Sequence, residues 1–242
     1  MDYLSTKNIP PRERLIFALD VPTVAEGKQW VEKLGDSVVF YKLGLQLFMA
    51  GGYYEFIDWL AARGKKIFAD LKFFDVPETV KSAVAQLNDR PVTFLTVHGN
   101  GSIMEAAASV KKNVKVLAVT VLTSLDQKDL ESLGFQCNVE DLVLSRARAA
   151  LETGCDGIIS SGLEAARIRQ NLGDKLLIIS PGIRPVVNKP ADDQKRTMDV
   201  EDAFRAGADY IVVGRPIRQA PDPKAKAEEI QQRITALFSA KK

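Results

Sequence analysis

The chain has 242 residues, of which 46% are hydrophobic, so it is long enough to form one large domain with a substantial core. Its 33 basic and 31 acidic residues leave a net charge of +2, and the basic residues are scattered along the chain. This pattern argues against a nucleic-acid-binding protein. No apolar run is long enough to span a membrane, and the N-terminus lacks a signal-peptide pattern. We therefore expect a soluble, cytoplasmic protein.

Histidine and cysteine are both scarce in this chain. Cys137 and Cys155 are the only cysteines, and two cysteines make neither a disulfide framework nor a zinc site. Cys155 lies in an apolar context and is expected in or near the core. His98 is the only histidine, so a Ser-His-Asp or Cys-His hydrolase would have to use it. Proton chemistry is therefore expected from Lys, Asp or Glu.

Short apolar runs alternate with longer segments of helical periodicity. A helix is predicted over 24–34, with Thr23 as its N-cap. Another helix begins at Pro77, because proline is favoured in the first turn, and a third spans 138–153 and ends at Gly154. The predicted strands are 15–20, 38–43, 66–71, 92–98, 114–120, 157–160, 176–180 and 210–214.

Eight strands alternating with helices predict a parallel sheet. In about 240 residues they match a (β/α)8 TIM barrel, formed here by a single domain over residues 1–242. A doubly wound open sheet is the alternative, but no G-x-G-x-x-G follows the first strand and no P-loop is present. The connection 181–198 is the longest without helical periodicity. Such connections are usually functional lids or disordered, so we predict a lid here, with a surface insertion as the alternative.

The most informative segment is D-L-K-F-F-D at 70–75, which ends an apolar run. Residues two apart in a strand share a face, so Asp70 and Lys72 are expected side by side at the carboxyl end of the third strand. Barrel active sites lie at these carboxyl ends. Asp20 ends the first strand and Lys42 lies in the second. Because buried charges are costly unless paired, we expect these four side chains to pair at one rim.

A second group of residues follows the last two strands. Gly214 would let a phosphate approach the backbone, and the planar guanidinium of Arg215 suits phosphate oxygens. Barrel phosphate sites often lie after strands seven and eight. Arg184 and Gln194 belong to the predicted lid that follows strand seven. Together these residues predict a phosphorylated small molecule as the ligand.

Several of these positions also have ordinary structural interpretations. Asp20 could cap the next helix, and Lys42 could extend to solvent from a half-buried strand. His98 is expected to be structural, hydrogen-bonded near the barrel rim. Thr120, at the end of the fifth predicted strand, and Thr123, just after it, could be ordinary strand and turn residues.

Seven ordered blocks cover nearly the whole chain. They are L-I-F-A-L-D (15–20), Y-K-L-G (41–44), F-A-D-L-K-F-F-D-V-P-E-T-V (68–80), A-V-T-V-L-T-S (118–124), S-P-G-I-R-P (180–185), D-D-Q-K-R (192–196) and I-V-V-G-R-P-I (211–217). On these blocks the chain resembles the bacterial orotidine 5′-phosphate decarboxylases. The resemblance implies conversion of orotidine 5′-monophosphate to uridine 5′-monophosphate in pyrimidine biosynthesis, with no cofactor and no metal.

The resemblance also implies roles for the residues of the first group. Lys72 is similar to the family's catalytic lysine, which protonates the carbanion at ring carbon six. Asp70 resembles the carboxylate beside the carboxylate of the substrate. Lys42 and Asp75 would complete an alternating network of four charges around the reacting carbon.

The remaining contacts are implied in the same way. Asp20 and Lys42 resemble contacts to the ribose, and Thr123 resembles a contact to the pyrimidine. Asp75 and Thr79 resemble residues that enter the site of a neighbouring subunit, which implies a homodimer with shared active sites. The implied phosphate and lid contacts are Arg184, Gln194, Gly214 and Arg215.

Two short segments depart from the family pattern. The chain has H-G-N-G-S at 98–102 where the family commonly has H-A-x-G-G, which leaves the conformation of that loop open. After Arg196 it has T-M-D-V where the family commonly has a T-P pair, although Asp199 can still cap the following helix. Two other functions stay open on the same barrel: a magnesium-dependent sugar-phosphate enzyme, and a non-catalytic sensor of a phosphorylated ligand.

Overall fold

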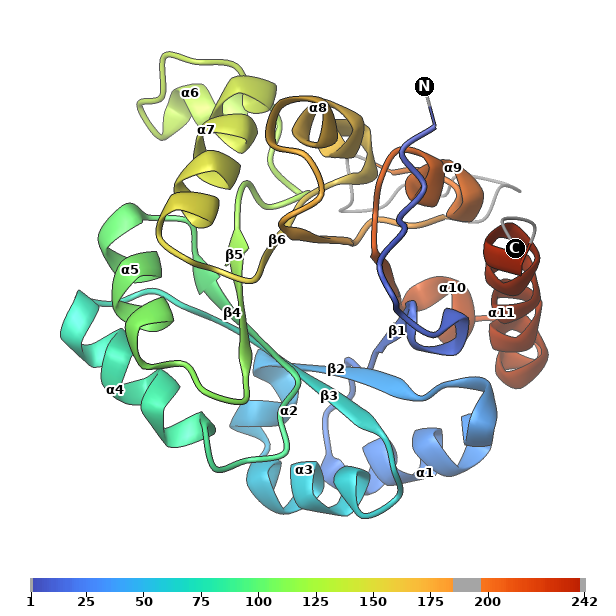
Figure 1. Cartoon of the computed structure of the whole chain (residues 1–242). Coiled ribbons are helices and arrows are strands. Elements are labelled where there is room, and N and C mark those ends of the chain that lie inside the picture. The colour runs from blue at the N-terminus through green and yellow to red at the C-terminus, as the bar shows by residue number, and fades with distance from the viewer. Residues whose placement is uncertain (1, 185–196, 240–242) are drawn as a thin grey trace.

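The computed structural model describes residues 2–184 and 197–239 and forms a closed barrel of eight parallel strands in chain order. Figure 1 shows the helices arranged as a ring around the strands. The barrel closes between its first and last strands, where Ile16 is paired with Val212. The predicted (β/α)8 barrel is confirmed.

All eight predicted strands are present, with ends that differ by a few residues. Their ends follow the hydrogen-bonded ladder, whereas the predicted ends followed the apolar runs. The strands are β1 (Leu15–Ala18), β2 (Phe40–Gly44), β3 (Lys66–Phe73), β4 (Phe94–His98), β5 (Lys115–Val119), β6 (Gly157–Ile159), β7 (Leu177–Ser180) and β8 (Tyr210–Val213).

The described helices are α1 (Val24–Leu34), α2 (Leu45–Met49), α3 (Tyr53–Ala61), α4 (Pro77–Leu87), α5 (Gly101–Val110), α6 (Gln127–Ser132), α7 (Val139–Glu152), α8 (Gly162–Leu172), α9 (Val200–Arg205), α10 (Arg215–Arg218) and α11 (Pro223–Ser239), with short 3-10 helices at Pro11–Glu13 and Gly35–Ser37. None of them is both long and apolar enough to cross a membrane. The predicted N-cap of α1 is confirmed, because the Thr23 hydroxyl accepts a hydrogen bond from the Glu26 amide at 3.1 Å. Pro77 lies in the first turn of α4, also as predicted.

Alternate strand residues fill the inside of the barrel. These side chains are Ile16, Ala18, Phe40, Phe68, Phe94, Leu117, Leu177, Ile179, Tyr210 and Val212. The Phe94 ring centre lies 5.1 Å from the ring centres of Phe40 and Tyr210 and 6.0 Å from that of Phe68. Along their strands Phe40 and Phe68 precede Lys42 and Asp70 by two positions, so both charged side chains follow directly above this aromatic floor.

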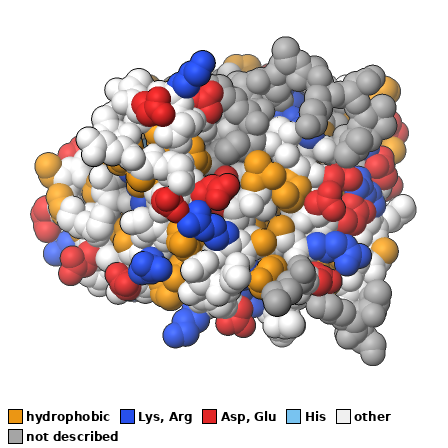
Figure 2. Space-filling model, turned by 90° about the horizontal axis from the view of Figure 1, so that it is seen from above, with side chains coloured by type: hydrophobic (Ala, Val, Ile, Leu, Met, Phe, Trp, Pro, Cys, Tyr) orange, Lys and Arg blue, Asp and Glu red, His pale blue; other side chains and the backbone are white. Residues whose placement is uncertain are grey.

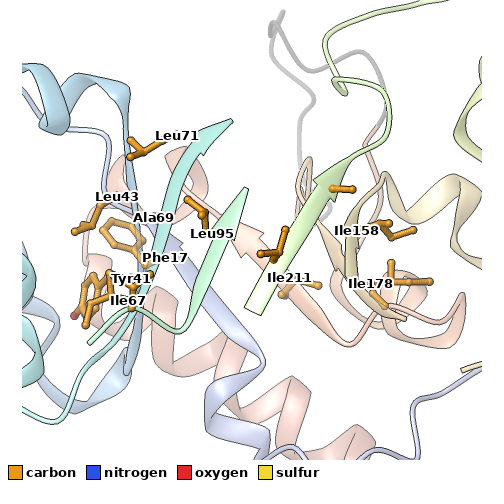
Figure 3. Packing of buried hydrophobic residues seen from close by; sticks show 14 of the residues in the cluster. Phe17, Tyr41, Leu43, Ile67, Ala69, Leu71, Leu95, Ile158, Ile178 and Ile211 are labelled. Atoms are coloured by element: carbon orange, nitrogen blue, oxygen red, sulfur yellow. The ribbon is translucent and has the colours of Figure 1, made fainter. Parts of the chain in front are cut away.

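The other strand face packs against the helices and forms the larger core. Figure 3 shows part of it, where Phe17, Tyr41, Leu43 and Ile67 lie together on the outside of neighbouring strands. Cys155 is buried in the same cluster, as predicted. Since both faces of the strands are buried, the barrel holds the strand ends rigidly.

A buried polar cluster closes the amino-terminal face of the barrel. Asp209, which is fully buried just before β8, accepts hydrogen bonds from the Ser5 hydroxyl at 2.5 Å and from Arg169 at 2.7 Å. It also accepts from the Ile178 amide at 3.0 Å and pairs with Lys7. These contacts hold the segment before β1 against the barrel, so the cluster stabilises the end opposite the predicted site.

The structure of the loop after β4 gives a reason for Gly99, the first residue of H-G-N-G-S that departs from the family pattern. The Gly99 amide donates to the Val119 carbonyl at 3.0 Å, and a Cβ atom added at Gly99 would lie only 2.5 Å from that carbonyl oxygen. Glycine is therefore required where the backbone of this loop meets the end of β5.

We expect Gly99→Ala to lower the free energy of unfolding by about 1–3 kcal/mol, because the backbone of β5 must move to admit the methyl group. Gly101→Ala is the matched control, since a Cβ at that position meets no atom within 4 Å. Urea denaturation of the two variants and the original protein measures the effect. Equal midpoints for all three would contradict the predicted close contact.

Candidate active site

A cavity of about 450 Å³ opens at the carboxyl ends of the strands. It lies where the sequence placed the site, and most of the predicted residues line it. These are Asp20, Lys42, Asp70, Lys72, Thr123, Arg184, Gly214 and Arg215. Figure 2 shows basic and acidic side chains interspersed over the visible face of the molecule, as expected from the nearly balanced charge.

Four charged side chains form a continuous alternating network in this cavity. The Asp70 carboxylate lies 2.8 Å from the Lys72 ammonium and 3.2 Å from the Lys42 ammonium. Lys42 continues to Asp20 at 3.3 Å. The Asp70 side chain is 10% exposed and that of Lys42 13%, whereas Asp20 is 49% exposed. The network thus runs from solvent at Asp20 to a desolvated centre at Asp70.

These contacts rule out the ordinary structural interpretations of Asp20 as a helix cap and of Lys42 as a side chain that extends to solvent. Thr23 caps α1, so Asp20 is left to pair with Lys42. Lys42 does not extend to solvent from its strand but lies between two carboxylates. Strand register explains the approach, because β2 and β3 are adjacent and Gly44 on β2 is paired with Asp70 on β3.

The pKa values of the two central groups follow from this arrangement. Burial would raise the pKa of Asp70, but the ammonium groups of Lys42 and Lys72 outweigh it and lower the pKa to about 2. Burial likewise opposes the charged form of Lys42, and the carboxylates of Asp70 and Asp20 overcome it, so the pKa of Lys42 is raised. Both groups are therefore ionised at neutral pH.

Lys72 occupies an unusual backbone conformation. Its φ is +49°, and among the described residues it is the one non-glycine residue with positive φ. The ladder between β3 and β4 is irregular at this point, with a register shift between Ala69 and Phe73. The alternation that predicted the pairing of Asp70 and Lys72 is therefore interrupted, yet the two side chains still meet.

Arginine side chains gather on another part of the cavity wall. Arg184 and Arg215 line it, as predicted, together with Arg218 at the end of α10. The Arg218 guanidinium donates a hydrogen bond to the backbone carbonyl of Asp20. Gly214 keeps the backbone close to β1, because an added Cβ would lie 3.2 Å from the Cβ of Ala18. The wall combines an accessible backbone with several guanidinium groups, a combination suited to phosphate.

The described ends of segment 181–198 are joined at the cavity. Ile183 and Met198 form a parallel bridge, in which the Arg184 amide donates to the Met198 carbonyl at 3.0 Å. Asp199 then caps α9, accepting from the Val200 amide at 2.7 Å, as expected despite the second departure. The predicted contact Gln194 lies outside the described residues.

The chain matches a protein-family model described as "Orotidine 5'-phosphate decarboxylase / HUMPS family" over residues 13–230. It belongs to that family. The predicted family resemblance is thereby confirmed.

Similar proteins extend over almost the whole chain. An orotidine 5′-phosphate decarboxylase of Methylococcus capsulatus is 60% identical over 99% of both chains, and one of Stenotrophomonas maltophilia is 49% identical over 95% of both. The crystal structure of an orotidine 5′-phosphate decarboxylase from Lactobacillus acidophilus is 35% identical, with a TM-score of 0.81, covering 92% of this chain and 99% of that one.

Two residues that the family resemblance places in a site lie outside the cavity of their own chain. Asp75 and Thr79 are exposed, and the Asp75 carboxylate accepts a hydrogen bond from the Val76 amide at 2.6 Å. Their neighbours Phe74 and Val76 are 65% and 63% exposed. In this chain the outer charge of the network is therefore Asp20, and Asp75 lies apart from it.

Sequence reasoning missed two residues near the charges, Arg218 and Thr96. Arg218 stands three positions after Arg215 on the same short helix, a spacing that could have indicated a shared face. Thr96 is fully buried and bonds to both Asp70 and Lys72. The one sequence feature that could have indicated Thr96 is its position on the inner face of β4, two residues before His98.

His98 contacts an aromatic ring at the barrel rim. Its ring centre lies 4.8 Å from that of Phe74, and the described residues show no hydrogen bond to its side chain. Burial, with help from Arg146 and Lys72, lowers the pKa of His98. Within residues 2–184 and 197–239, no cluster of three or more His, Cys, Asp or Glu side chains could hold a metal ion.

The lowered pKa of Asp70 predicts a pH-dependent stability. The carboxylate stabilises the fold above its ordinary pKa near 3.8, and this contribution, on the order of 2 kcal/mol, is lost as pH falls toward about 2. The stability difference between the original protein and Asp70→Asn should therefore shrink as urea denaturation is repeated from pH 6 to pH 3. Asp36→Asn is the control, because the Asp36 side chain is 98% exposed, and its difference should stay near zero. A stability difference between the original protein and Asp70→Asn that stayed constant over this pH range would contradict the lowered pKa of Asp70.

Proposed function

We propose that this protein converts orotidine 5′-monophosphate to uridine 5′-monophosphate and carbon dioxide in pyrimidine biosynthesis, in the cytoplasm and without a cofactor. Family membership and the names of its similar proteins support the substrate and the reaction. The observation that carries the proposal is the desolvated Asp70 carboxylate, held between the ammonium groups of Lys42 and Lys72 in a cavity with an arginine-bearing wall.

The charges suit a reaction that develops negative charge on carbon. When the bond from ring carbon six to the carboxylate breaks, its electron pair stays on carbon six and carbon dioxide leaves. The Lys72 ammonium stabilises this carbanion and then donates a proton to it, and Lys72 regains a proton from water. Asp70 forms an ion pair with the Lys72 ammonium and lies beside the departing carboxylate, where its repulsion of the substrate raises the energy of the bound ground state.

The arginine-bearing wall would hold the phosphate of the substrate. Gly214, Arg215 and Arg184 line the cavity and would receive it, and Gln194, which lies outside the described residues, is the further phosphate contact in this proposal. Asp20 and Lys42 contact the ribose, and Thr123 contacts the pyrimidine. Binding at the phosphate then supplies free energy for orienting the ring against Lys72.

A homodimer would explain the position of Asp75 and Thr79. Asp75 lies on the connection between β3 and α4, and Thr79 lies in the first turn of α4. Both are exposed, and the apolar side chains of Phe74 and Val76 on the same connection are exposed as well. Exposed apolar side chains in one region are typical of a protein–protein interface. A second subunit seated there would receive Asp75 and Thr79 in its own site, next to Lys72, and Asp75 would add a further carboxylate to the network of Asp20, Lys42, Asp70 and Lys72.

We expect Lys72→Ala to lower the turnover of orotidine 5′-monophosphate by at least about 10³-fold, because the proton donor and the charge facing the carbanion are both lost. Binding of uridine 5′-monophosphate, followed by calorimetry, should remain measurable. Turnover is followed by the loss of orotidylate ultraviolet absorbance, with EDTA present and no added cofactor.

Lys115→Ala is the control for this experiment, because Lys115 is an exposed lysine at the amino-terminal end of β5. Near-normal turnover by Lys72→Ala would contradict the assignment. Turnover only after magnesium is supplied, and only of a sugar phosphate, would favour the magnesium-dependent alternative. Nucleotide binding without turnover by the original protein would favour the sensor.

Mixing two inactive variants tests the shared site. Lys72→Ala and Asp75→Asn should each be nearly inactive, but after subunit exchange random pairing gives mixed dimers with one intact site, restoring about a quarter of full activity. The control mixes Lys72→Ala with Asp70→Asn, whose defects lie in the same chain's site and should restore nothing. Failure of the first mixture to recover activity would exclude Asp75 from the partner's site.

A further inference from the structure

The ladder between β3 and β4 has an irregularity beside the charge network. Ala69 is paired with Leu95, and the next pair is Phe73 with Val97. Three residues of β3, from Asp70 to Lys72, therefore face the single residue Thr96 on β4. A bulge of this kind leaves backbone groups without their ladder partners and redirects side chains.

The hydroxyl of Thr96 replaces the missing partner on one side of this bulge. It accepts a hydrogen bond from the backbone amide of Lys72 at 3.0 Å. Lys72 has φ +49°, and such a conformation persists in a non-glycine residue only when its surroundings hold it. This hydrogen bond is a contact that holds it.

The single hydroxyl proton of Thr96 is directed at the second member of the network. Thr96 donates to one carboxylate oxygen of Asp70, Oδ1, at 2.9 Å. The other oxygen, Oδ2, faces both ammonium groups, at 2.8 Å from Lys72 and 3.2 Å from Lys42. With one oxygen committed to Thr96 and one to the lysines, the rotation of the carboxylate is fixed.

Burial makes this arrangement specific. Thr96 has no exposed surface, and along β4 it follows Phe94, a ring of the aromatic floor. Loss of the hydroxyl would leave the Lys72 amide without this partner and the buried Asp70 Oδ1 without its donor.

We propose that Thr96 is a positioning residue, whose hydroxyl fixes the Lys72 backbone and the Asp70 carboxylate relative to each other for the reaction. The inference rests on the proposed function for its kinetic consequence only. Thr96 is not among the residues that line the cavity; it sets where the Lys72 ammonium and its neighbouring carboxylate lie. A displacement of about 1 Å in such a group lowers rates by as much as roughly 10²-fold.

The test compares Thr96→Val, which keeps the shape and removes the hydroxyl, with Thr96→Ser, which keeps the hydroxyl. For Thr96→Val we expect kcat for orotidine 5′-monophosphate to fall roughly 10–100-fold while KM changes less than about threefold, because the phosphate contacts are untouched. Thr96→Ser should stay within about threefold of the original kcat. Thr120→Val is the matched control: Thr120 is also fully buried and donates to the Ile159 carbonyl at 2.8 Å, away from the network.

A second measurement does not depend on turnover. Carbon-13 NMR titration of the Asp70 carboxyl should give a higher pKa in Thr96→Val than in the original protein, and an unchanged pKa in Thr120→Val, because only the first loses a donor to the carboxylate. A crystal structure of Thr96→Val should show Lys72 displaced from its left-handed conformation.

The possible outcomes separate this proposal from the proposed function. An original protein without activity would refute the proposed function, and the titration and the Lys72 conformation would still decide the role of Thr96. Original kcat and an unmoved Asp70 titration in Thr96→Val would overturn the proposal. Equal kcat losses in Thr96→Val and Thr120→Val would overturn it as well, because the effect would then be a general consequence of losing a buried hydroxyl.

Discussion

The buried Asp70 carboxylate is the constraint on which the rest of the site depends. A carboxylate above an aromatic floor is stable only if cations and hydrogen-bond donors replace its lost hydration. Lys42, Lys72 and Thr96 supply these groups from three neighbouring strands. The stability of the Asp70 carboxylate therefore depends on the order and register of β2, β3 and β4. In return the low exposure strengthens every charge interaction there, and this is the condition under which a fixed ammonium group can stabilise a carbanion.

Paired buried charges do not by themselves mark a site, as the two ends of this barrel show. Asp209 is more completely buried than Asp70 and is surrounded by Arg169, Lys7 and backbone donors, and its contacts join segments of the chain. Around Asp70 the same kind of pairing borders open space, and Lys72 remains partly exposed to that space. The difference lies in access, which the barrel provides at its carboxyl end.

Much of the fold could be predicted because it depends on local signals. Apolar runs gave the eight strands, Thr23 and Pro77 gave helix starts, and the position of Asp20 and Lys42 at strand ends placed them at one rim. The role of Thr96 could not be predicted, because it depends on how β3 and β4 pair at a bulge, and no local sequence pattern indicates that bulge. The chain alone also cannot place Asp75 in a site, since its carboxylate is exposed and lies apart from the charge network, and its proposed role depends on a second subunit.

The pairing of Asp70 with Lys72 was predicted from strand alternation, but the structure reaches it by another route. At Lys72 the strand is no longer regular, and the lysine meets the carboxylate from a left-handed residue held by Thr96. A regular strand would place both side chains on one face and leave their separation to the flexible lysine chain. Fixing the backbone of Lys72 and one oxygen of Asp70 through the same hydroxyl removes much of that freedom before any ligand binds. The barrel, whose strands are buried on both faces, offsets the cost of this backbone conformation, and it leaves the Lys72 ammonium already in position for the proton transfer proposed above.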